Sequence, residues 1–464
     1  MPDPISIMSP GRAHLVGIGG AGMRALAEYL LDGGWTLTGS DLDTQTPGLR
    51  ALAERGVGLA SGHNRDHLSE ETDLVIHSAA VPSTNPERSA ARDRNLPDLS
   101  YVDLLELLCR DREAIGIAGT HGKSTTTALC SWILESSGAD PGYLCGAELV
   151  GKRRGGRAGA GPHLVVECCE FRRHFLKIPV RTAAILSVEP DHFDCYGSIA
   201  ETVDAFAAFA QNLPDDGLLL WNAACAGAAQ AIAGATCRTE SFAVGAPADW
   251  TVANVACSGR ETGFEIVHHG AVVTHVLLPM PGRHNVANAL AAAVLCLNHG
   301  VAPEQVVEGL ASFPGLRRRF EFRGTWRGAV LVDDYAHHPT EIRAALQAAR
   351  EVCPGSRLRC VFQPHQRRRT EELMDEFAGA LVEADDVIVM PVFSARESDD
   401  RANETLSREL AMRTKEQGGR AEFGTSLDRI AATLETDVRE GDVLITLGAG
   451  DIYRLHDRFD RTIL

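Results

Sequence analysis

The sequence contains no long apolar run and no paired cysteine motif. No stretch approaches the roughly 18 apolar residues of a membrane-spanning helix, and Met1–Pro10 lacks the charged and apolar regions of a signal peptide. The 12 cysteines include no Cys-x-x-Cys pair, so nothing of this kind suggests a zinc or redox motif. We therefore expect a cytoplasmic protein with free thiols and no membrane insertion.

Basic residues are also scarce. The chain has 45 lysines and arginines against 62 acidic residues, which gives a formal net charge of −17. A general nucleic-acid binder would show a basic surface, so we expect small-molecule partners and no nucleic acid. No repeat of solenoid period is visible. The length of 464 residues is too great for one compact core and predicts two or three domains.

Alternating strand and helix patterns recur in three stretches, which predicts an α/β protein of three domains: 1–110, 111–325 and 326–464. The expected strands are 13–18, 35–39 and 72–78 in the first domain, 114–118, 163–167 and 182–188 in the second, and 329–332, 358–362, 386–390 and 443–447 in the third. Helices are expected at 23–32, 125–134 and 286–297, and an antiparallel patch near 264–278.

The central stretch opens with Gly119-Thr120-His121-Gly122-Lys123-Ser124 between an expected strand and an expected helix. Glycines let backbone N–H groups converge on phosphate oxygens, and the helix N-terminus adds partial positive charge. Lys123 can reach the terminal phosphates and Ser124 can ligate Mg²⁺. Ile117 stands where the strict P-loop pattern has glycine, so an ordinary glycine turn is the alternative.

A second glycine loop, Gly17-Ile18-Gly19-Gly20-Ala21-Gly22, lies near the N-terminus. It matches G-x-G-x-x-G between strand and helix, and Asp41 follows at the end of the next strand. This arrangement is typical of NAD-binding folds, but the same turn can bind any pyrophosphate, including that of a UDP-sugar. A tight turn required only for packing is the third possibility.

Polar residues follow several expected strands, where an open α/β sheet places its ligand crevice. Glu167 and Asp191-His192 come after two strands of the central stretch, so a carboxylate and an imidazole could help to place Mg²⁺. A hydrogen-bonded structural histidine is the alternative there. Gly282–Asn285 with Asn288 could contact a nucleoside or could cap a helix. The runs Arg317–Arg319 and Arg367–Arg369 have side chains that match phosphate and carboxylate groups. Asp333–Pro339 places polar groups after another strand, and it also suits a helix start.

Together these motifs resemble the Mur ligases, and in particular those members that join L-alanine to UDP-N-acetylmuramate. The resemblance keeps its order over nearly the whole chain and lies in His14–Met23, Gly39–Asp41, Gly119–Thr126, Asp191–Asp194, Gly282–Asn288, Arg318–Glu321, Asp333–Glu341, Phe362–His365 and Leu447–Ile452. It implies Rossmann-like N- and C-terminal domains on either side of a central P-loop ATPase-type α/β domain. The N-terminal domain would bind the UDP-sugar, the central domain would bind ATP, and the C-terminal domain would bind the amino acid.

The resemblance also implies roles for individual residues. Expected ATP contacts are Gly119, Thr120, His121, Gly122, Lys123, Ser124, Thr125, His284, Asn288, Arg319 and Asp334. Expected UDP-sugar contacts are Gly17, Gly19, Gly20, Ala21, Gly22, Met23, Ser40 and Asp41. Ser124, Glu167 and His192 would hold Mg²⁺, and the catalytic set would be Lys123, His192, His337, His338 and Arg369.

Two departures from the family pattern affect substrate contacts. The usual Glu-Ala-Asp-Glu-Ser-Asp reads Glu167-Cys168-Cys169-Glu170-Phe171-Arg172 here, so an acidic residue is lost at Cys169. The usual Gln-Pro-His-Arg reads Gln363-Pro364-His365-Gln366, and Arg367 or Arg368 could substitute for the missing arginine.

The implied activity is ATP-dependent ligation of L-alanine to the lactyl carboxylate of UDP-N-acetylmuramate, through an acyl phosphate, by a monomer or a homodimer. A ligase that recycles murein tripeptide onto the same UDP-sugar stays open as the alternative. A Rossmann NAD enzyme or NAD-binding regulator and a non-catalytic nucleotide-binding scaffold are rivals of other classes. Calorimetry of NAD binding tests the first, and an assay of ADP release tests the second.

Overall fold

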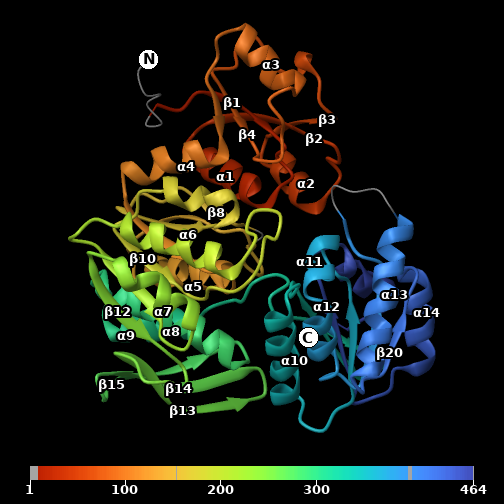
Figure 1. The fold of residues 1–464 in the computed structure, drawn as a ribbon. Coiled ribbons are helices and arrows are strands. Elements are labelled where there is room, and N and C mark those ends of the chain that lie inside the picture. Colours follow the sequence, from red (N-terminus) through yellow and green to blue (C-terminus); the bar gives the residue numbers. More distant parts are fainter. Residues whose placement is uncertain (1–8, 153, 395–399, 463–464) are drawn as a thin grey trace.

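The computed structural model describes residues 9–152, 154–394 and 400–462. Figure 1 shows three α/β bodies that follow one another along the chain, each built around one β-sheet. The sheets have 5, 10 and 6 strands in the part of the chain that is described, and most neighbouring strands are parallel. The three-domain α/β fold predicted from the sequence is confirmed.

The first sheet is wholly parallel and has the order β3-β2-β1-β4-β5. Its strands are β1 (Arg12–Val16), β2 (Thr36–Asp41), β3 (Gly58–Ser61), β4 (Leu74–His77) and β5 (Asp98–Ser100). Its helices are α1 (Ala21–Asp32), α2 (Pro47–Glu54), η1 (Arg65–His67), α3 (Pro86–Asp93) and α4 (Tyr101–Arg110). Because β1 and β4 are central, they are mostly apolar and almost wholly buried, with Arg12 as the exposed residue.

The second sheet has the order β15-β14-β13-β12-β11-β10-β6-β9-β7-β8. Its strands are β6 (Glu113–Ala118), β7 (Gly142–Leu144), β8 (Gly156–Arg157), β9 (His163–Cys168), β10 (Thr182–Ile185), β11 (Leu218–Asn222), β12 (Arg238–Phe242), β13 (Trp250–Ser258), β14 (Glu261–His268) and β15 (Ala271–Leu278). Its helices are α5 (Lys123–Ser136), η2 (Phe171–Lys177), α6 (Ile199–Gln211), α7 (Ala226–Ala231), η3 (Ile232–Gly234), α8 (Arg283–Asn298) and α9 (Pro303–Ala311). The predicted antiparallel patch is confirmed as β14 and β15, and β13, which was not predicted, adds a third antiparallel strand.

The third sheet has the order β16-β17-β21-β18-β19-β20, and only β16 runs antiparallel to its neighbour. Its strands are β16 (Glu321–Trp326), β17 (Ala329–Asp334), β18 (Leu358–Phe362), β19 (Asp386–Val389), β20 (Ala421–Phe423) and β21 (Val443–Leu447). Its helices are α10 (Pro339–Val352), α11 (Arg367–Glu372), α12 (Met374–Leu381), α13 (Asp400–Glu416), α14 (Leu427–Asp437) and η4 (Ile452–Arg458).

The predicted strand 182–188 is the clearest boundary error. Strand β10 ends at Ile185, and the residues after it form a loop that supports the glycine turn at 119–122. Thr120 N donates to Ser187 O and His121 N donates to Ser187 Oγ, both at 2.9 Å. The apolar run continued past the strand because Leu186 and Val188 are buried beneath this loop.

The two domain junctions differ in chemistry. One continuous apolar cluster joins the first two domains, and in it α1 packs on β7 and β8. Glu28 adds two hydrogen bonds at 2.7 Å from the amides of Gly155 and Gly156. The third domain has apolar clusters of its own and meets the central domain mainly through polar side chains, with Phe193 as an apolar contact. We therefore expect the third domain to be the one that moves.

The cysteines are free thiols, and no disulfide occurs among the described residues. Over the same residues, no helix combines the length and the apolar character that crossing a membrane requires.

Candidate active site

The glycine turn after β6 has the backbone geometry of a phosphate loop. Gly119 and Gly122 have φ of +142° and +81°, conformations that other residues rarely adopt. A Cβ on Gly122 would also lie 2.4 Å from Asn288 Oδ1, so glycine is required there for space as well. Helix α5 begins directly after this glycine, at Lys123. The positive end of a 14-residue helix therefore lies at the turn.

Lys123 lies over the turn and pairs with a buried carboxylate. Its Nζ donates to the carbonyl oxygens of Gly119 and Thr120, the latter at 3.1 Å, and lies 2.9 Å from Glu170 Oε2. Burial opposes its charge, but Glu170 outweighs that effect and raises the pKa of Lys123. The ammonium is therefore charged at neutral pH and is held over the glycine turn.

Glu170 follows the strand that ends near Glu167, and the sequence assigned it no role at this site. Its side chain is 2% exposed, yet Lys123 and His192 overcome the effect of burial and lower its pKa. His192 Nε2 lies 3.5 Å from Glu170 Oε1, and ligand atoms of Cys169, Glu170 and His192 lie within 4.8 Å of one another. The available signal was a carboxylate just past the end of β9.

Glu167 and Ser124 lie beside the same turn. Glu167 pairs with Ile117 across the sheet, and its Oε1 accepts a hydrogen bond from Gly146 N at 2.5 Å. Ser124 is buried in the first turn of α5. Oxygen donors from two carboxylates and one hydroxyl fit the preference of Mg²⁺, whereas His192 is a less usual ligand.

A cavity of about 530 Å³ opens beside the turn, between the central and third domains. The predicted residues His121, Gly122, Thr125, His284, Asn288, Arg319 and Asp334 line it. Thr340 and Glu341 of α10 and Asn222 of β11 are also part of the lining. The structure thus brings together phosphate-loop and nucleoside candidates from segments more than 200 residues apart.

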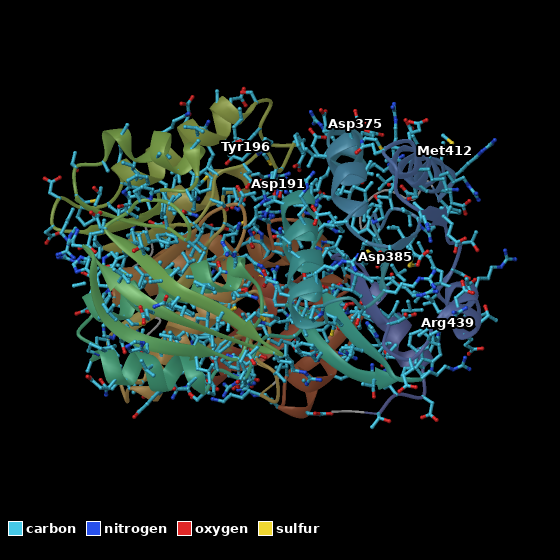
Figure 2. The ribbon with its side chains drawn as sticks, turned by 90° about the horizontal axis from the view of Figure 1, so that it is seen from below. Asp191, Tyr196, Asp375, Asp385, Met412 and Arg439 are labelled. Carbon is cyan, nitrogen blue, oxygen red and sulfur yellow. The ribbon has the colours of Figure 1, made fainter. Side chains whose placement is uncertain are left out.

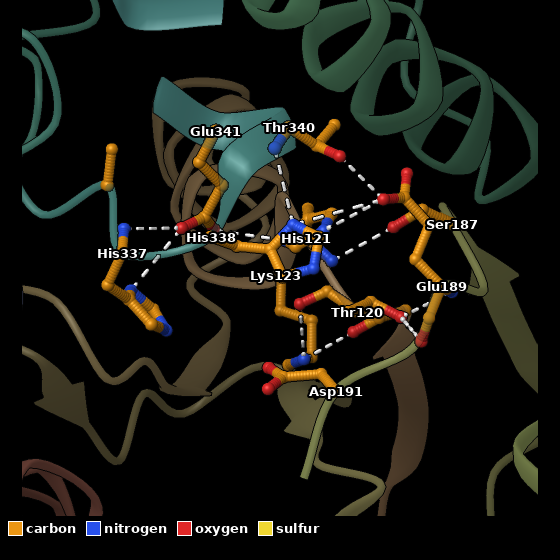
Figure 3. A network of polar contacts seen from close by, with 12 residues as sticks. Thr120, His121, Lys123, Ser187, Glu189, Asp191, His337, His338, Thr340 and Glu341 are labelled. Carbon is orange, nitrogen blue, oxygen red and sulfur yellow. Dashed lines mark hydrogen bonds and ion pairs between the residues drawn. The ribbon is translucent and has the colours of Figure 1, made fainter. Parts of the chain in front are cut away.

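Figure 3 shows the polar network at the edge of this cavity. His121 Nδ1 donates to Glu341 Oε1 at 3.1 Å, and His121 Nε2 lies 3.6 Å from Glu189 Oε2. Burial by itself would lower the pKa of His121, but the two carboxylates raise it to about 9. Thr340 Oγ1 donates to Glu189 Oε2 at 2.6 Å. A charged histidine therefore links the phosphate loop to α10.

His337 and His338 lie at the start of α10. His338 donates from Nε2 to Pro190 O at 3.1 Å and accepts at Nδ1 from Thr340 N, so both of its ring nitrogens are engaged. His337 donates from Nδ1 to Tyr335 O at 3.0 Å. Burial lowers the pKa of both histidines to about 4, so both are neutral at pH 7.

Arg369 reaches across the junction from α11 to the central domain. Its Nε lies 2.8 Å from Asp191 Oδ1, and the two side chains are only 3% and 7% exposed. Despite burial, the guanidinium keeps the pKa of Asp191 well below its usual range. Figure 2 places Asp191 where the central and third domains meet.

Arg319 and Asp334 both line the cavity. Asp334 accepts hydrogen bonds from Phe320 N and Ala336 N at 2.6 and 2.7 Å. Burial outweighs these bonds and raises the pKa of Asp334 to about 6.

Arg368 is a poor substitute for the family arginine that Gln366 replaces, since the side chain of Arg368 is 58% exposed and faces Glu372.

The N-terminal glycine loop borders a separate cavity of about 760 Å³. Gly17, Gly19, Gly20 and Asp41 line it, and Gly19 N donates to Asp41 Oδ2 at 2.8 Å.

The other residues predicted for this loop lie elsewhere. Ala21 lines a different cavity, at the meeting of all three domains, and Gly22 lies against Tyr101. Met23 is in the core. Ser40 is fully buried and donates to Glu87 Oε2 at 2.9 Å, so its hydroxyl is engaged inside the domain and does not face the cavity.

The fold and the site define a class: a three-domain α/β protein with a phosphate loop whose nucleotide cavity is completed by the third domain. Three family models match in sequence order: the Mur ligase family, catalytic domain at residues 12–113, the Mur ligase middle domain at 117–296, and the Mur ligase, glutamate ligase domain at 318–450. The chain belongs to the Mur ligase family, which uses ATP.

Known relatives match this chain over nearly its full length. The chain is 39% identical to UDP-N-acetylmuramate–L-alanine ligase of Kineococcus radiotolerans, covering 95% of this chain and 94% of that one. It is 35% identical to the ligase of that name from Clostridium novyi, covering 97% of each. The structure of UDP-N-acetylmuramate-alanine ligase from Thermotoga maritima matches with a TM-score of 0.82 and 29% identity, over 97% and 98% of the chains. A murein peptide ligase from Psychrobacter arcticus matches with a TM-score of 0.71 and 25% identity, over the same shares.

Proposed function

We propose that this protein joins L-alanine to the lactyl carboxylate of UDP-N-acetylmuramate with hydrolysis of ATP to ADP and phosphate, a step in the synthesis of peptidoglycan precursors. The observation that carries the proposal is the phosphate loop at 119–124 facing a cavity that Arg319 and, from the third domain, Asp334 and Glu341 close. Relatives that carry this activity in their names match at 33–39% identity over nearly the whole chain.

The division of labour follows the three domains, with proposed boundaries at 1–110, 111–325 and 326–464. The UDP-sugar binds at the N-terminal loop, with Gly17, Gly19, Gly20 and Asp41 nearest to it. ATP binds in the central cavity, and L-alanine enters from the side of the third domain. Glycine N–H groups and Lys123 hold the ATP phosphates, and the nucleoside lies between His284 and Asn288 on one side and α10 on the other.

Activation of the carboxylate is a phosphoryl transfer, which depends on positioning and on neutralisation of charge. The lactyl carboxylate attacks the γ-phosphorus, the bond to the β,γ-bridging oxygen breaks, and ADP leaves. Lys123 is suited to neutralise the transferring group because Glu170 keeps it charged and fixes its direction. Glu167, Glu170 and Ser124 would hold Mg²⁺, with His192 beside them, and the ion would supply further neutralisation of phosphate charge.

The amine of L-alanine then attacks the acyl phosphate and releases inorganic phosphate, and a proton must leave the nitrogen. Both ring nitrogens of His338 are engaged. His337 uses Nδ1 as a donor, so the lone pair of its neutral ring is at Nε2. We therefore favour His337 over His338 as the proton acceptor. Arg369 holds Asp191 at the junction and closes this region against water.

The test is ADP release with UDP-N-acetylmuramate and a panel of acceptors: L-alanine, glycine, L-serine and the murein tripeptide. The Lys123→Ala variant should lose at least about 100-fold in kcat, since an interaction made in the transition state disappears. Lys152→Ala is the matched control, because Lys152 is a 39% exposed lysine of the same domain, paired with Glu135. Preference for the tripeptide would identify the recycling reaction instead, and substantial turnover by Lys123→Ala would refute the role of the lysine.

A further inference from the structure

A second group of metal-ligating side chains lies at the opposite end of the central sheet from the phosphate loop. Glu113 begins β6, His163 begins β9, and His299 follows the last residue of α8. One ligand atom from each lies within 4.8 Å of the others. The phosphate loop follows the far end of β6, so this group is separate from the nucleotide site.

The contacts within the group leave one buried imidazole nitrogen without a partner among the described residues. His163 Nε2 lies 3.4 Å from Glu113 Oε2, and the rings of His163 and His299 meet edge-on with centroids 5.0 Å apart. His299 Nε2 lies 3.1 Å from Thr182 Oγ1. The buried Nδ1 of His163 has no hydrogen-bond partner within the part of the chain that the structure describes. An unpaired buried nitrogen is costly unless something binds there.

The electrostatics of the group favour a cation. His299 caps the C-terminal end of α8, a 16-residue helix whose last carbonyls carry partial negative charge. Burial and the neighbouring His163 lower the pKa of His299 to about 4, so its ring is neutral and able to ligate at pH 7. The side chain of Glu113 is 60% exposed, which gives the group access to solvent. His299 also borders a cavity of about 290 Å³ whose charged lining is mixed, with Asp215 and Asp216 beside Arg181 and Arg238.

The geometry points to a site for a Zn²⁺-class transition-metal ion formed by Glu113, His163 and His299, distinct from the Mg²⁺ of the ATP site. Two imidazoles and one carboxylate suit Zn²⁺, Co²⁺ or Ni²⁺ and are a poor set for Mg²⁺. Three protein ligands leave the fourth position to water. Bound metal would join the starts of two central strands to the end of α8, so it would stabilise the central domain.

The experiment uses the full-length protein without an affinity tag, with saturating Mg²⁺ and a non-hydrolysable ATP analogue to occupy the nucleotide site. Titration calorimetry with Zn²⁺ should show one equivalent bound. The double variant His163→Gln/His299→Gln should bind that equivalent at least about tenfold more weakly and lose the rise in Tm that Zn²⁺ produces in the unaltered protein. His275→Gln is the control, since His275 is a 76% exposed histidine of the same domain.

Two further variants distinguish loss of the metal site from misfolding of the double variant and from binding of Zn²⁺ at another site. Glu113→Gln changes only an exposed side chain and should also weaken binding of Zn²⁺. Cys169→Ser tests the cluster beside the phosphate loop, and it should leave the affinity and the Co²⁺ absorption spectrum unchanged, without a thiolate charge-transfer band. The proposal is wrong if the protein binds no equivalent of Zn²⁺, if Glu113→Gln and the double variant bind it as the control does, or if only Cys169→Ser loses it.

Discussion

The buried pair of Asp191 and Arg369 offers the sharpest test of how the site is assembled. Asp191→Asn keeps the shape of the side chain and removes its charge. Arg369, 3% exposed, then faces a neutral amide oxygen instead of a carboxylate, beside its contacts to the carbonyl oxygen and Nδ1 of His365 at 3.2 and 3.3 Å. A guanidinium without its carboxylate in such a place is strongly disfavoured.

The size of the effect follows from the distance of 2.8 Å between Arg369 Nε and Asp191 Oδ1. With an effective dielectric constant of about 20, the Coulomb attraction is about 6 kcal/mol, part of which offsets desolvation. Breaking a buried pair by removing one partner costs about 3–5 kcal/mol, and the remaining His365 contacts favour the lower end. Because the pair joins the central and third domains, losing it destabilises the closed arrangement, in which these two domains are in contact. About 3 kcal/mol corresponds to roughly a 100-fold shift toward the open arrangement.

The assay combines alanine-dependent ADP release with small-angle scattering in the presence of an ATP analogue. Asp191→Asn should lower kcat/KM by about 100-fold and should increase the radius of gyration of the nucleotide-bound enzyme. Asp216→Asn is the matched control: it also breaks an aspartate–arginine pair in the central domain, with Arg181, but both side chains are more than 60% exposed. Such a pair contributes less than about 1 kcal/mol.

Two results would refute this reasoning. If Asp191→Asn keeps kcat/KM within threefold of the control, the pair does not hold the assembled site. If activity falls with the loss of Tm and with no change in scattering, the pair stabilises the fold and does not govern closure.

Two further predictions concern the phosphate loop. His121 has a pKa of about 9 in the folded protein against about 6.5 when unfolded. Its protonation should contribute about 3 kcal/mol to the free energy of unfolding. This contribution is fully present below pH 6.5 and is lost as the pH rises toward 9. Denaturant unfolding from pH 6 to 8 should show this slope in the unaltered protein and a flatter one in His121→Asn; equal slopes would contradict the assignment. Gly122→Ala should abolish binding of an ATP analogue, because the added Cβ would lie 2.4 Å from Asn288 Oδ1. Gly270→Ala is the control: Gly270 has a similar φ of +83° but open space around it, so the substitution should cost only backbone strain of about 1–2 kcal/mol. Equal calorimetric affinities for the analogue in both variants would exclude the steric argument.

Local patterns in the sequence were enough for the fold and for much of the site. The phosphate loop is readable because strand, glycine turn, lysine and helix are contiguous, and their geometry depends on neighbouring residues. Candidates at 284, 288, 319 and 334 were found through motif order, and the structure places all of them around one cavity. Glu170 and Glu189 received no role from the sequence, because an acidic residue after a strand looks the same whether it faces solvent or a buried lysine.

The sequence by itself determined the three α/β units, the phosphate loop and the family to which the chain belongs, since each rests on short-range periodicity or on motifs read along the chain. Only the tertiary structure decided which side chains meet across the junction: Lys123 with Glu170, His121 with Glu341, and Arg369 with Asp191. It also turned Ser40 inward to Glu87. The physical reason is that charge state and partner depend on burial and distance, which arise from packing between segments far apart in the chain.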